Sequence, residues 1–137
     1  MMNGLKEFLS TAPTVPAIDA EQFYAHGYAL YQSGRAKDAV DVFRVLSARQ
    51  PFELRFWFGL GASLQEDRSY SEALCAWAMA ALLEPADPYP HFHAAECAYS
   101  LHQKDEALKA LAEAKARIKD SSHPLKGPVE LLEERWS

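Results

Sequence analysis

The sequence lacks the features that define several common classes of protein. It has only two cysteines among 137 residues, Cys75 and Cys97, and neither lies in a C-x-x-C pair. A zinc finger or a dithiol redox motif is therefore not expected. Both residues are predicted to be reduced, small apolar side chains within helices. The formal net charge of −5 argues against a nucleic-acid partner, because phosphates require a basic surface.

Long apolar runs are missing too. No stretch approaches the ~20 apolar residues that a membrane-spanning helix needs. The opening residues, MMNGLKEFLSTAPTVPAID, do not combine a basic start with an apolar run, so a secretory signal peptide is not expected. These absences predict a cytoplasmic protein that does not insert into a membrane.

Catalytic and cofactor motifs are also absent. The sequence contains no G-x-S-x-G or H-E-x-x-H, and Gly59-Leu60-Gly61 lacks the third glycine and the preceding strand of a dinucleotide-binding turn. His91 and His93 are two residues apart, so on a helix they point to different sides. The other histidines have no acidic or cysteine partner at ligand spacing. We therefore predict no enzymatic activity, no metal site and no cofactor.

What the sequence does contain is an internal repeat with the period of the tetratricopeptide motif, a helix pair of about 34 residues. Small residues, a large apolar residue and a proline recur at this spacing. The columns are Gly27, Gly61 and Ala95; Ala39, Ala73 and Ala107; Phe43, Trp77 and Leu111; Leu46, Ala80 and Ala114; and Pro51 with Pro85. The pattern predicts an all-α fold of three tetratricopeptide repeats stacked as a right-handed α-solenoid.

Helix periodicity and capping signals place the individual elements. Ser69 with Glu72 is typical of a capping box, and Asp87 followed by Pro88 is typical of an N-cap with proline in the first turn. The predicted helices cover residues 3–10, 19–32, 35–49, 53–66, 69–83, 87–101, 103–119 and 127–136. We predict three parts: an N-terminal amphipathic segment with a proline linker (1–18), the repeat domain (19–119) and a C-terminal capping helix (120–137).

The glycines of the stretch RFWFGLGASLQ (55–65) indicate close packing. Glycine in a helix costs roughly 1 kcal/mol relative to alanine, so Gly59 is predicted to lie where a neighbour leaves no room for a side chain. Small residues in the repeated columns are predicted to let helices approach closely. The ring of Phe43 or Trp77 is predicted to fill the space between a helix pair and its neighbour.

The first helix of each repeat is predicted to line a concave groove. When residues 20, 54 and 88 begin the repeats, positions 4, 7, 8 and 11 face the core and positions 2, 5, 9 and 12 face the groove. The predicted peptide-binding residues are Tyr24, Tyr28, Tyr31, Phe58, Ala62, Gln65, Tyr89, Phe92, Glu96 and Tyr99. Such a trough suits an extended peptide with apolar anchors. The same rings could instead pack against the capping segments or against a second copy. With Arg55 as the only basic groove residue, a clamp for a C-terminal carboxylate is not expected.

Three runs of sequence resemble a specific family, the class II chaperones of bacterial type III secretion. They are ALYQSGRAKDAVDVFRVLSARQP, RFWFGLGASLQEDRSYSEAL and HFHAAECAYSLHQKDEALKAL, and together they lie within about residues 19–117. The FHAAEC and RFWFGLGA segments are more specific than the general repeat pattern. The resemblance implies a small, acidic cytoplasmic chaperone. Such a protein holds an extended segment of a hydrophobic translocator in its groove before secretion and so keeps the translocator from aggregating.

The resemblance also implies a homodimer formed through the N-terminal segment, with Leu5, Phe8 and Leu9 at the interface. The alternative is a tetratricopeptide adaptor of another assembly, which would have the same fold. A cognate translocator as partner distinguishes the first hypothesis from the second.

Overall fold

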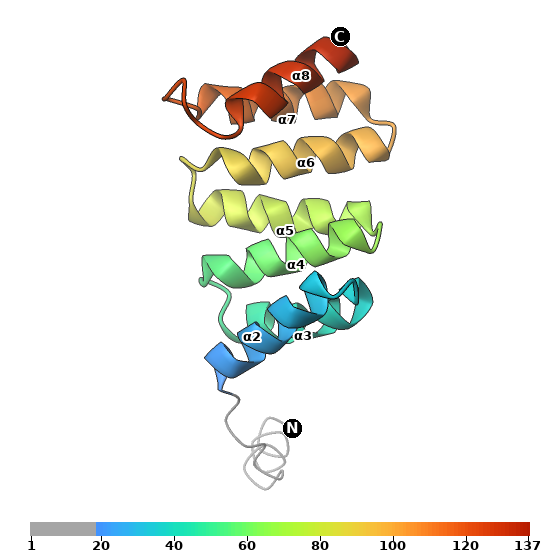
Figure 1. Cartoon of the computed structure of the whole chain (residues 1–137), viewed down its shortest axis with the longest axis vertical. Helices are drawn as coiled ribbons and strands as arrows, with labels where there is room; N and C mark the ends of the chain where they lie inside the picture. Colours follow the sequence, from blue (N-terminus) through green and yellow to red (C-terminus); the bar gives the residue numbers. More distant parts are fainter. Residues whose placement is uncertain (1–18) are drawn as a thin grey trace, which may run out of the picture.

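In a computed structural model, residues 19–137 are described and form seven α-helices without any strand (Figure 1). The helices are α2 (Ala20–Gln32), α3 (Ala36–Arg49), α4 (Leu54–Glu66), α5 (Tyr70–Leu83), α6 (Pro88–Ser100), α7 (Lys104–Ala116) and α8 (Lys126–Trp136). Their bounds agree closely with the predicted ones. The predicted helix at 3–10 and the proline linker lie outside the described residues. Within 19–137, no helix has both the length and the apolar character that crossing a membrane requires.

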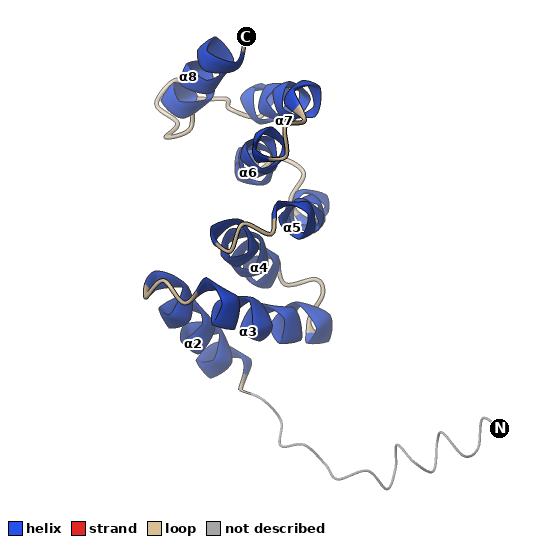
Figure 2. Ribbon diagram, turned by 90° about the vertical axis from the view of Figure 1, so that its right-hand side faces the viewer, coloured by secondary structure: helices blue, strands red, loops and turns tan. Residues whose placement is uncertain are grey.

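The helices are stacked in chain order along one axis (Figure 1), and each packs against the next. Seen from the side, α2, α4 and α6 form one layer and α3, α5 and α7 form the other (Figure 2). This arrangement is the all-α solenoid of helix pairs that the repeat period predicted. The C-terminal helix α8 packs on α7, where its residues Val129 and Trp136 are buried.

The capping predictions were right at one helix and wrong at another. Asp87 caps α6, since its carboxylate accepts a hydrogen bond from the backbone N–H of Tyr89 at 2.9 Å, and Pro88 is the first helical residue. Ser69 makes no capping hydrogen bond to α5. Its hydroxyl donates instead to Asp67 at 3.3 Å, and the side chain of Glu72 pairs with Arg44 of the preceding repeat. The capping-box prediction fails because both side chains have other partners.

A tryptophan and a proline of the repeat pattern are joined by a hydrogen bond. The indole Nε1 of Trp57 donates to the backbone carbonyl oxygen of Pro51 at 2.8 Å and ties α4 to the turn before it. In the third repeat, His91 occupies the position of this tryptophan. The equivalent carbonyl, that of Pro85, accepts from Nε of Arg117 at 2.6 Å. A residue from the end of α7 thus replaces the missing indole.

The small repeated residues do let the helices approach closely, as predicted. Ala39, Ala73 and Ala107 are fully buried. A Cβ added at Gly61 would lie 2.6 Å from the ring of Trp77, and one added at Gly59 would lie 2.3 Å from the ring of Phe43. The prediction that Gly59 has no room for a side chain is therefore confirmed. Backbone contact with these rings sets the spacing of the first-layer helices.

The turn within each helix pair has a left-handed residue at the same repeat position. These residues are Gly34 (φ 82°), Arg68 (φ 62°) and His102 (φ 61°). Only the first repeat has glycine there, and glycine is the residue that adopts this conformation without a steric cost.

Replacing Arg68 or His102 by glycine is expected to stabilise the fold. The left-handed conformation costs a residue with a Cβ roughly 1–2 kcal/mol, and the extra entropy that glycine loses offsets about half of this gain. Each substitution should raise the free energy of unfolding by about 0.5–1 kcal/mol, measured by urea denaturation. Gly34→Ala is the matched control and should change stability in the opposite direction. A loss of stability in Arg68→Gly would contradict the assignment.

The two cysteines should differ in reactivity. Cys97 is fully buried, and this burial, with a smaller contribution from Glu96, raises the pKa of its thiol to about 12. Cys75 is exposed on α5. Because the thiolate is the reactive form, iodoacetamide at mildly alkaline pH should modify Cys75 in the native protein and Cys97 only in denaturant. Peptide mass spectrometry measures this, and a Cys75→Ser variant should remain unlabelled. Labelling of Cys97 at a similar rate in the native state would show that its site opens.

Candidate functional site

An apolar cavity of about 470 Å³ lies between α2 and α4, on the first-helix layer of the solenoid. Its floor includes rings from the second layer. The lining residues are Tyr24, Tyr28, Tyr31, Phe43, Leu54, Arg55, Phe58, Gly59, Ala62, Trp77 and His93. An apolar cavity with few polar groups is the usual form of a binding site.

The rings of the cavity are held by one another. Tyr24 packs edge-on against Phe43 with ring centroids 5.9 Å apart. Phe58 packs edge-on against Trp77 at 5.2 Å, and the rings of His93 and Trp77 are stacked at 4.7 Å. Phe43 and Trp77 are almost fully buried, so they anchor rings that are only partly covered. The apolar surface is therefore built in advance and needs no rearrangement to accept a ligand.

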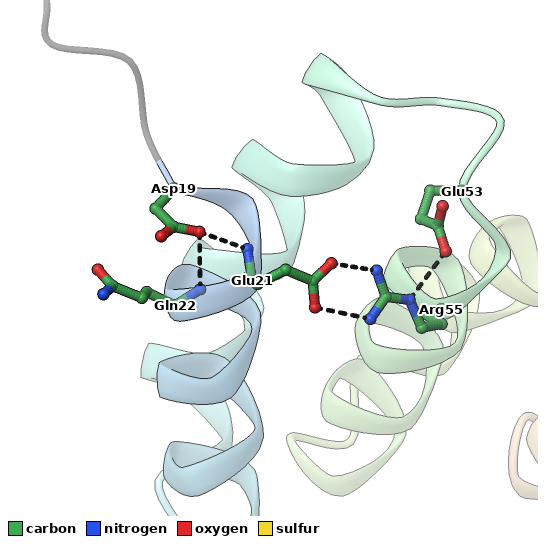
Figure 3. Close-up of polar contacts among 5 residues, drawn as sticks. All are labelled: Asp19, Glu21, Gln22, Glu53 and Arg55. Carbon is green, nitrogen blue, oxygen red and sulfur yellow. Dashed lines mark hydrogen bonds and ion pairs between the residues drawn. The ribbon is translucent and has the colours of Figure 1, made fainter.

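One rim of the cavity carries a charge cluster that spans two repeats (Figure 3). The guanidinium of Arg55 makes two hydrogen bonds to Glu21, at 2.7 and 3.1 Å, and a third to Glu53 at 2.8 Å. Glu21 and Arg55 occupy the same position in successive repeats. Hydrogen bonding to Arg55 lowers the pKa of Glu21, and the two carboxylates raise the pKa of Arg55. The Arg55 guanidinium also lies 4.8 Å from the Tyr24 ring centroid.

The Arg55 guanidinium is therefore already bound to two carboxylates, those of Glu21 and Glu53. A client carboxylate would have to displace one of them.

The opposite end of the cavity is polar. There the amide of Gln65 donates to the carboxylate of Glu96 at 3.1 Å and accepts from the indole of Trp77 at 3.2 Å. Nδ1 of His93 lies 2.8 Å from the same oxygen of Glu96. These side chains border a second hollow of about 240 Å³ that continues from the cavity past Tyr31 and Ala62. Burial, followed by the charge of Glu66, raises the pKa of the Tyr31 hydroxyl.

Seven of the ten predicted groove residues are brought together by the fold. Five line the apolar cavity: Tyr24, Tyr28, Tyr31, Phe58 and Ala62. Gln65 and Glu96 lie in the adjoining polar hollow.

The other three, Tyr89, Phe92 and Tyr99, are used elsewhere. Phe92 is only 8% exposed and belongs to the core cluster of the third repeat, so its predicted place in the groove was wrong. Tyr99 stacks on Trp136 of α8 with centroids 4.4 Å apart, and Tyr89 lies 5.7 Å from the ring of His123. For these two tyrosines, packing against the C-terminal segment is what the structure shows.

The sequence prediction missed several lining residues. Phe43 and Trp77 were predicted only to fill the space between helix pairs. Both rings are buried there as predicted, and both also border the cavity. Gly59 and His93 share repeat position 6, which was not assigned to the groove. A signal was available at Gly59, because a helix residue without a side chain exposes whatever ring lies behind it.

Comparison with known proteins places the chain in a family. Residues 20–50 match the family model described as a tetratricopeptide repeat. The chain is 34% identical over 125 residues to the low calcium response locus protein H of Yersinia pestis, a match that covers 87% of this chain and 74% of that protein.

Solved structures agree with this match. The type III secretion chaperone SycD of Yersinia enterocolitica, in complex with a peptide of the translocator YopD, superposes with a TM-score of 0.82. It is 30% identical, with 90% of this chain and 96% of that chain covered. PcrH, in complex with the chaperone-binding region of PopD, gives a TM-score of 0.80 and 32% identity, with 85% and 89% covered. The chain belongs to the class II chaperones of type III secretion, a family of chaperones built from tetratricopeptide repeats and not of enzymes.

Proposed function

We propose that this protein is a cytoplasmic chaperone that binds and stabilises hydrophobic translocators of a type III secretion system. It holds an extended segment of the translocator in the groove formed by α2, α4 and α6. Related chaperones that match along most of the chain have been solved in complex with translocator segments. They are SycD with a peptide of YopD, and PcrH with the chaperone-binding regions of PopD and PopB. A translocator carries apolar segments that would aggregate in water, and a groove that covers part of them lowers that tendency.

The observation that carries the proposal is the preformed aromatic cavity. Its lining offers rings for apolar anchors. Tyrosine hydroxyls at its edge can bond a peptide backbone. The partner it fits is an apolar, extended peptide rather than one with an acidic anchor, because Arg55 at one rim is already paired with Glu21 and Glu53.

A homodimer is part of the same proposal. The Yersinia enterocolitica chaperone SycD has a solved structure described as an alternative dimer. In this chain the predicted contacts are Leu5, Phe8 and Leu9, which lie outside the described residues. Sedimentation of a Leu5→Asp/Phe8→Asp variant tests this part alone, because it leaves the cavity residues unchanged. A sedimentation coefficient equal to that of the parent chain would remove these residues from any interface.

Tyr28→Ala is expected to weaken translocator binding about tenfold, which corresponds to about 1.4 kcal/mol. Tyr28 is 48% exposed and borders the cavity, so its loss removes contact with a ligand but little core packing. The measurement is calorimetric titration of the full chain with the chaperone-binding region of a translocator from the same organism. Phe52→Ala is the matched control, since Phe52 is 86% exposed and lies outside the cavity. Unchanged affinity in Tyr28→Ala would remove this rim from the proposed site.

A further inference from the structure

The polar hollow is continuous with the aromatic cavity. Four residues line both of them: Tyr31, Ala62, Trp77 and His93. A ligand that lies in the cavity and extends towards α6 therefore passes over the hollow. The remaining lining residues of the hollow are Gln65, Glu66 and Glu96, so the ligand meets an amide and two carboxylates there.

The carboxylate of Glu96 is held in position by its neighbours. Its Oε1 atom accepts from the amide of Gln65 at 3.1 Å and lies 2.8 Å from Nδ1 of His93. Both neighbours are themselves fixed, since Gln65 accepts from the indole of Trp77 and the ring of His93 is stacked on the same indole. The other oxygen, Oε2, has no hydrogen-bond partner among residues 19–137. Glu96 thus offers a positioned acceptor to a ligand in the hollow.

The charge of the hollow differs from that of the opposite rim. Among the described residues, no lysine or arginine lines the hollow, and His93 adds a positive charge only when it is protonated. Burial and, after it, the charge of Glu66 raise the pKa of the Tyr31 hydroxyl, which lines the same space. At the opposite rim Arg55 is paired with two carboxylates. The groove is therefore negative at one end, where it would attract a cation.

The mixed lining suits a side chain with an apolar stem and a cationic head. Lysine and arginine bury their methylene groups along apolar surface and keep the charged group in a polar setting. Here Ala62 and the rings of Tyr31 and Trp77 border the hollow beside its carboxylates. A hydrogen bond from a cationic donor to a carboxylate is also stronger than one between neutral groups.

The positions of the cavity and the hollow set a spacing along the client. The cavity lies between α2 and α4, and the hollow extends to α6, the next helix of the same layer (Figure 2). Packed helices lie about 8–10 Å apart, and an extended chain advances about 3.3 Å per residue. With the reach of a long side chain added, an apolar anchor in the cavity and a basic residue over the hollow are about two to four residues apart.

We propose that Glu96 is a specificity-determining residue of the groove and that, with Glu66, it selects clients with a lysine or arginine about two to four residues from their apolar anchor. The inference rests on the proposed function, because it takes the groove as the client site, and it adds a second element of recognition. The cavity covers the anchor, and the hollow favours segments that carry a cation at the right distance. Segments with an acidic residue there are rejected, since like charges repel.

The test is a peptide selection with the full-length chain and no translocator. A phage-displayed library of random 12-residue peptides is selected on the parent chain, on Glu66→Gln/Glu96→Gln and on Glu106→Gln/Glu130→Gln. Glutamine at position 96 keeps an oxygen that can accept from Gln65, so the fold is retained. Glu106 and Glu130 are exposed on α7 and α8 and lie outside the cavity and the hollow, so the second variant is a control with the same change in charge.

The parent should enrich peptides with a large apolar residue and a lysine or arginine about two to four positions away. Glu66→Gln/Glu96→Gln should keep the apolar residue and lose the basic one, and the control should enrich the same motif as the parent. Identical motifs from the parent and from Glu66→Gln/Glu96→Gln would overturn the inference. Basic residues at no fixed spacing would also overturn it, because they would indicate attraction to the net negative charge of the whole chain.

A synthetic peptide from the selection gives a second readout. Replacing its basic residue by norleucine should weaken binding to the parent about fivefold, measured by fluorescence anisotropy, and leave binding to Glu66→Gln/Glu96→Gln unchanged. Equal losses for the two chains would show that the hollow does not read this residue. The proposed function is tested separately with a translocator segment. Failure of that segment to bind the parent would count against the proposed function, whereas the peptide selection decides the role of Glu96.

Discussion

Gly59→Ala is expected to destabilise the protein by about 2 kcal/mol, although alanine is the better helix former. The new Cβ would lie 2.3 to 2.6 Å from three carbon atoms of the Phe43 ring. That ring has little room to move, because Phe43 is fully buried and its edge lies so close to α2 that even a Cβ built at Gly27 would come within 3.1 Å of it. Overpacking a closed core costs about 1–3 kcal/mol or more, against a gain in helix propensity of about 1 kcal/mol. Urea denaturation measures the difference.

Gly127→Ala is the matched control for this prediction. Gly127 lies in the exposed first turn of α8, and a Cβ there would meet nothing within 4 Å. The control should be neutral or stabilising by up to about 1 kcal/mol. If Gly59→Ala behaved like Gly127→Ala, Phe43 could not be wedged between α2 and α4, and the cavity floor would be softer than the structure indicates.

Ala62→Trp is expected to reduce translocator affinity about 100-fold, or about 2.7 kcal/mol, with no loss of stability. Ala62 is half-buried on α4 and lines both the apolar cavity and the polar hollow beside it. An indole there would fill space that the ligand needs, and the surrounding rings would cover its apolar surface. The full chain is titrated calorimetrically with the translocator segment, and its urea midpoint is measured in parallel.

Ala78→Trp provides the control for Ala62→Trp. Ala78 is exposed on α5, in the other layer of the solenoid, so the same change in side chain leaves the cavity open. Equal affinities for the two variants would exclude the cavity as the client site. A large loss of stability in Ala62→Trp would mean that the cavity closes in solution.

The two predictions address different properties of the same rings. Phe43 is both the wedge that spaces α2 from α4 and part of the cavity floor. Trp77 is likewise packed against Gly61 while its ring faces the cavity and bonds to Gln65. Stability and binding therefore share Phe43 and Trp77, and substitutions at lining residues outside the core, such as Tyr28→Ala and Ala62→Trp, separate the two.

The sequence alone determined the all-α repeat fold. A regular repeat with glycine and alanine in fixed columns leaves few ways to bury the apolar residues, because each helix pair needs its neighbour to cover it. The helix bounds followed from local signals, and the close approach at Gly59 followed from the cost of glycine in a helix. The lining of the apolar cavity was predictable where the repeats are regular, at Tyr24, Tyr28, Tyr31, Phe58 and Ala62.

Only the tertiary structure decided which side chains of the third repeat are buried and what they contact. Phe92 has the same repeat position as Tyr24 and Phe58, yet it is buried in the core cluster shared with α8. The ring of Tyr99 stacks on Trp136. Arg117 donates a hydrogen bond to the Pro85 carbonyl, which in a regular repeat would accept one from a tryptophan. The repeat position of a residue predicts the direction in which its side chain leaves the helix axis. Whether that side chain is buried depends on which other part of the chain packs against it. At the end of the array that neighbour is α8, and no repeat column describes it.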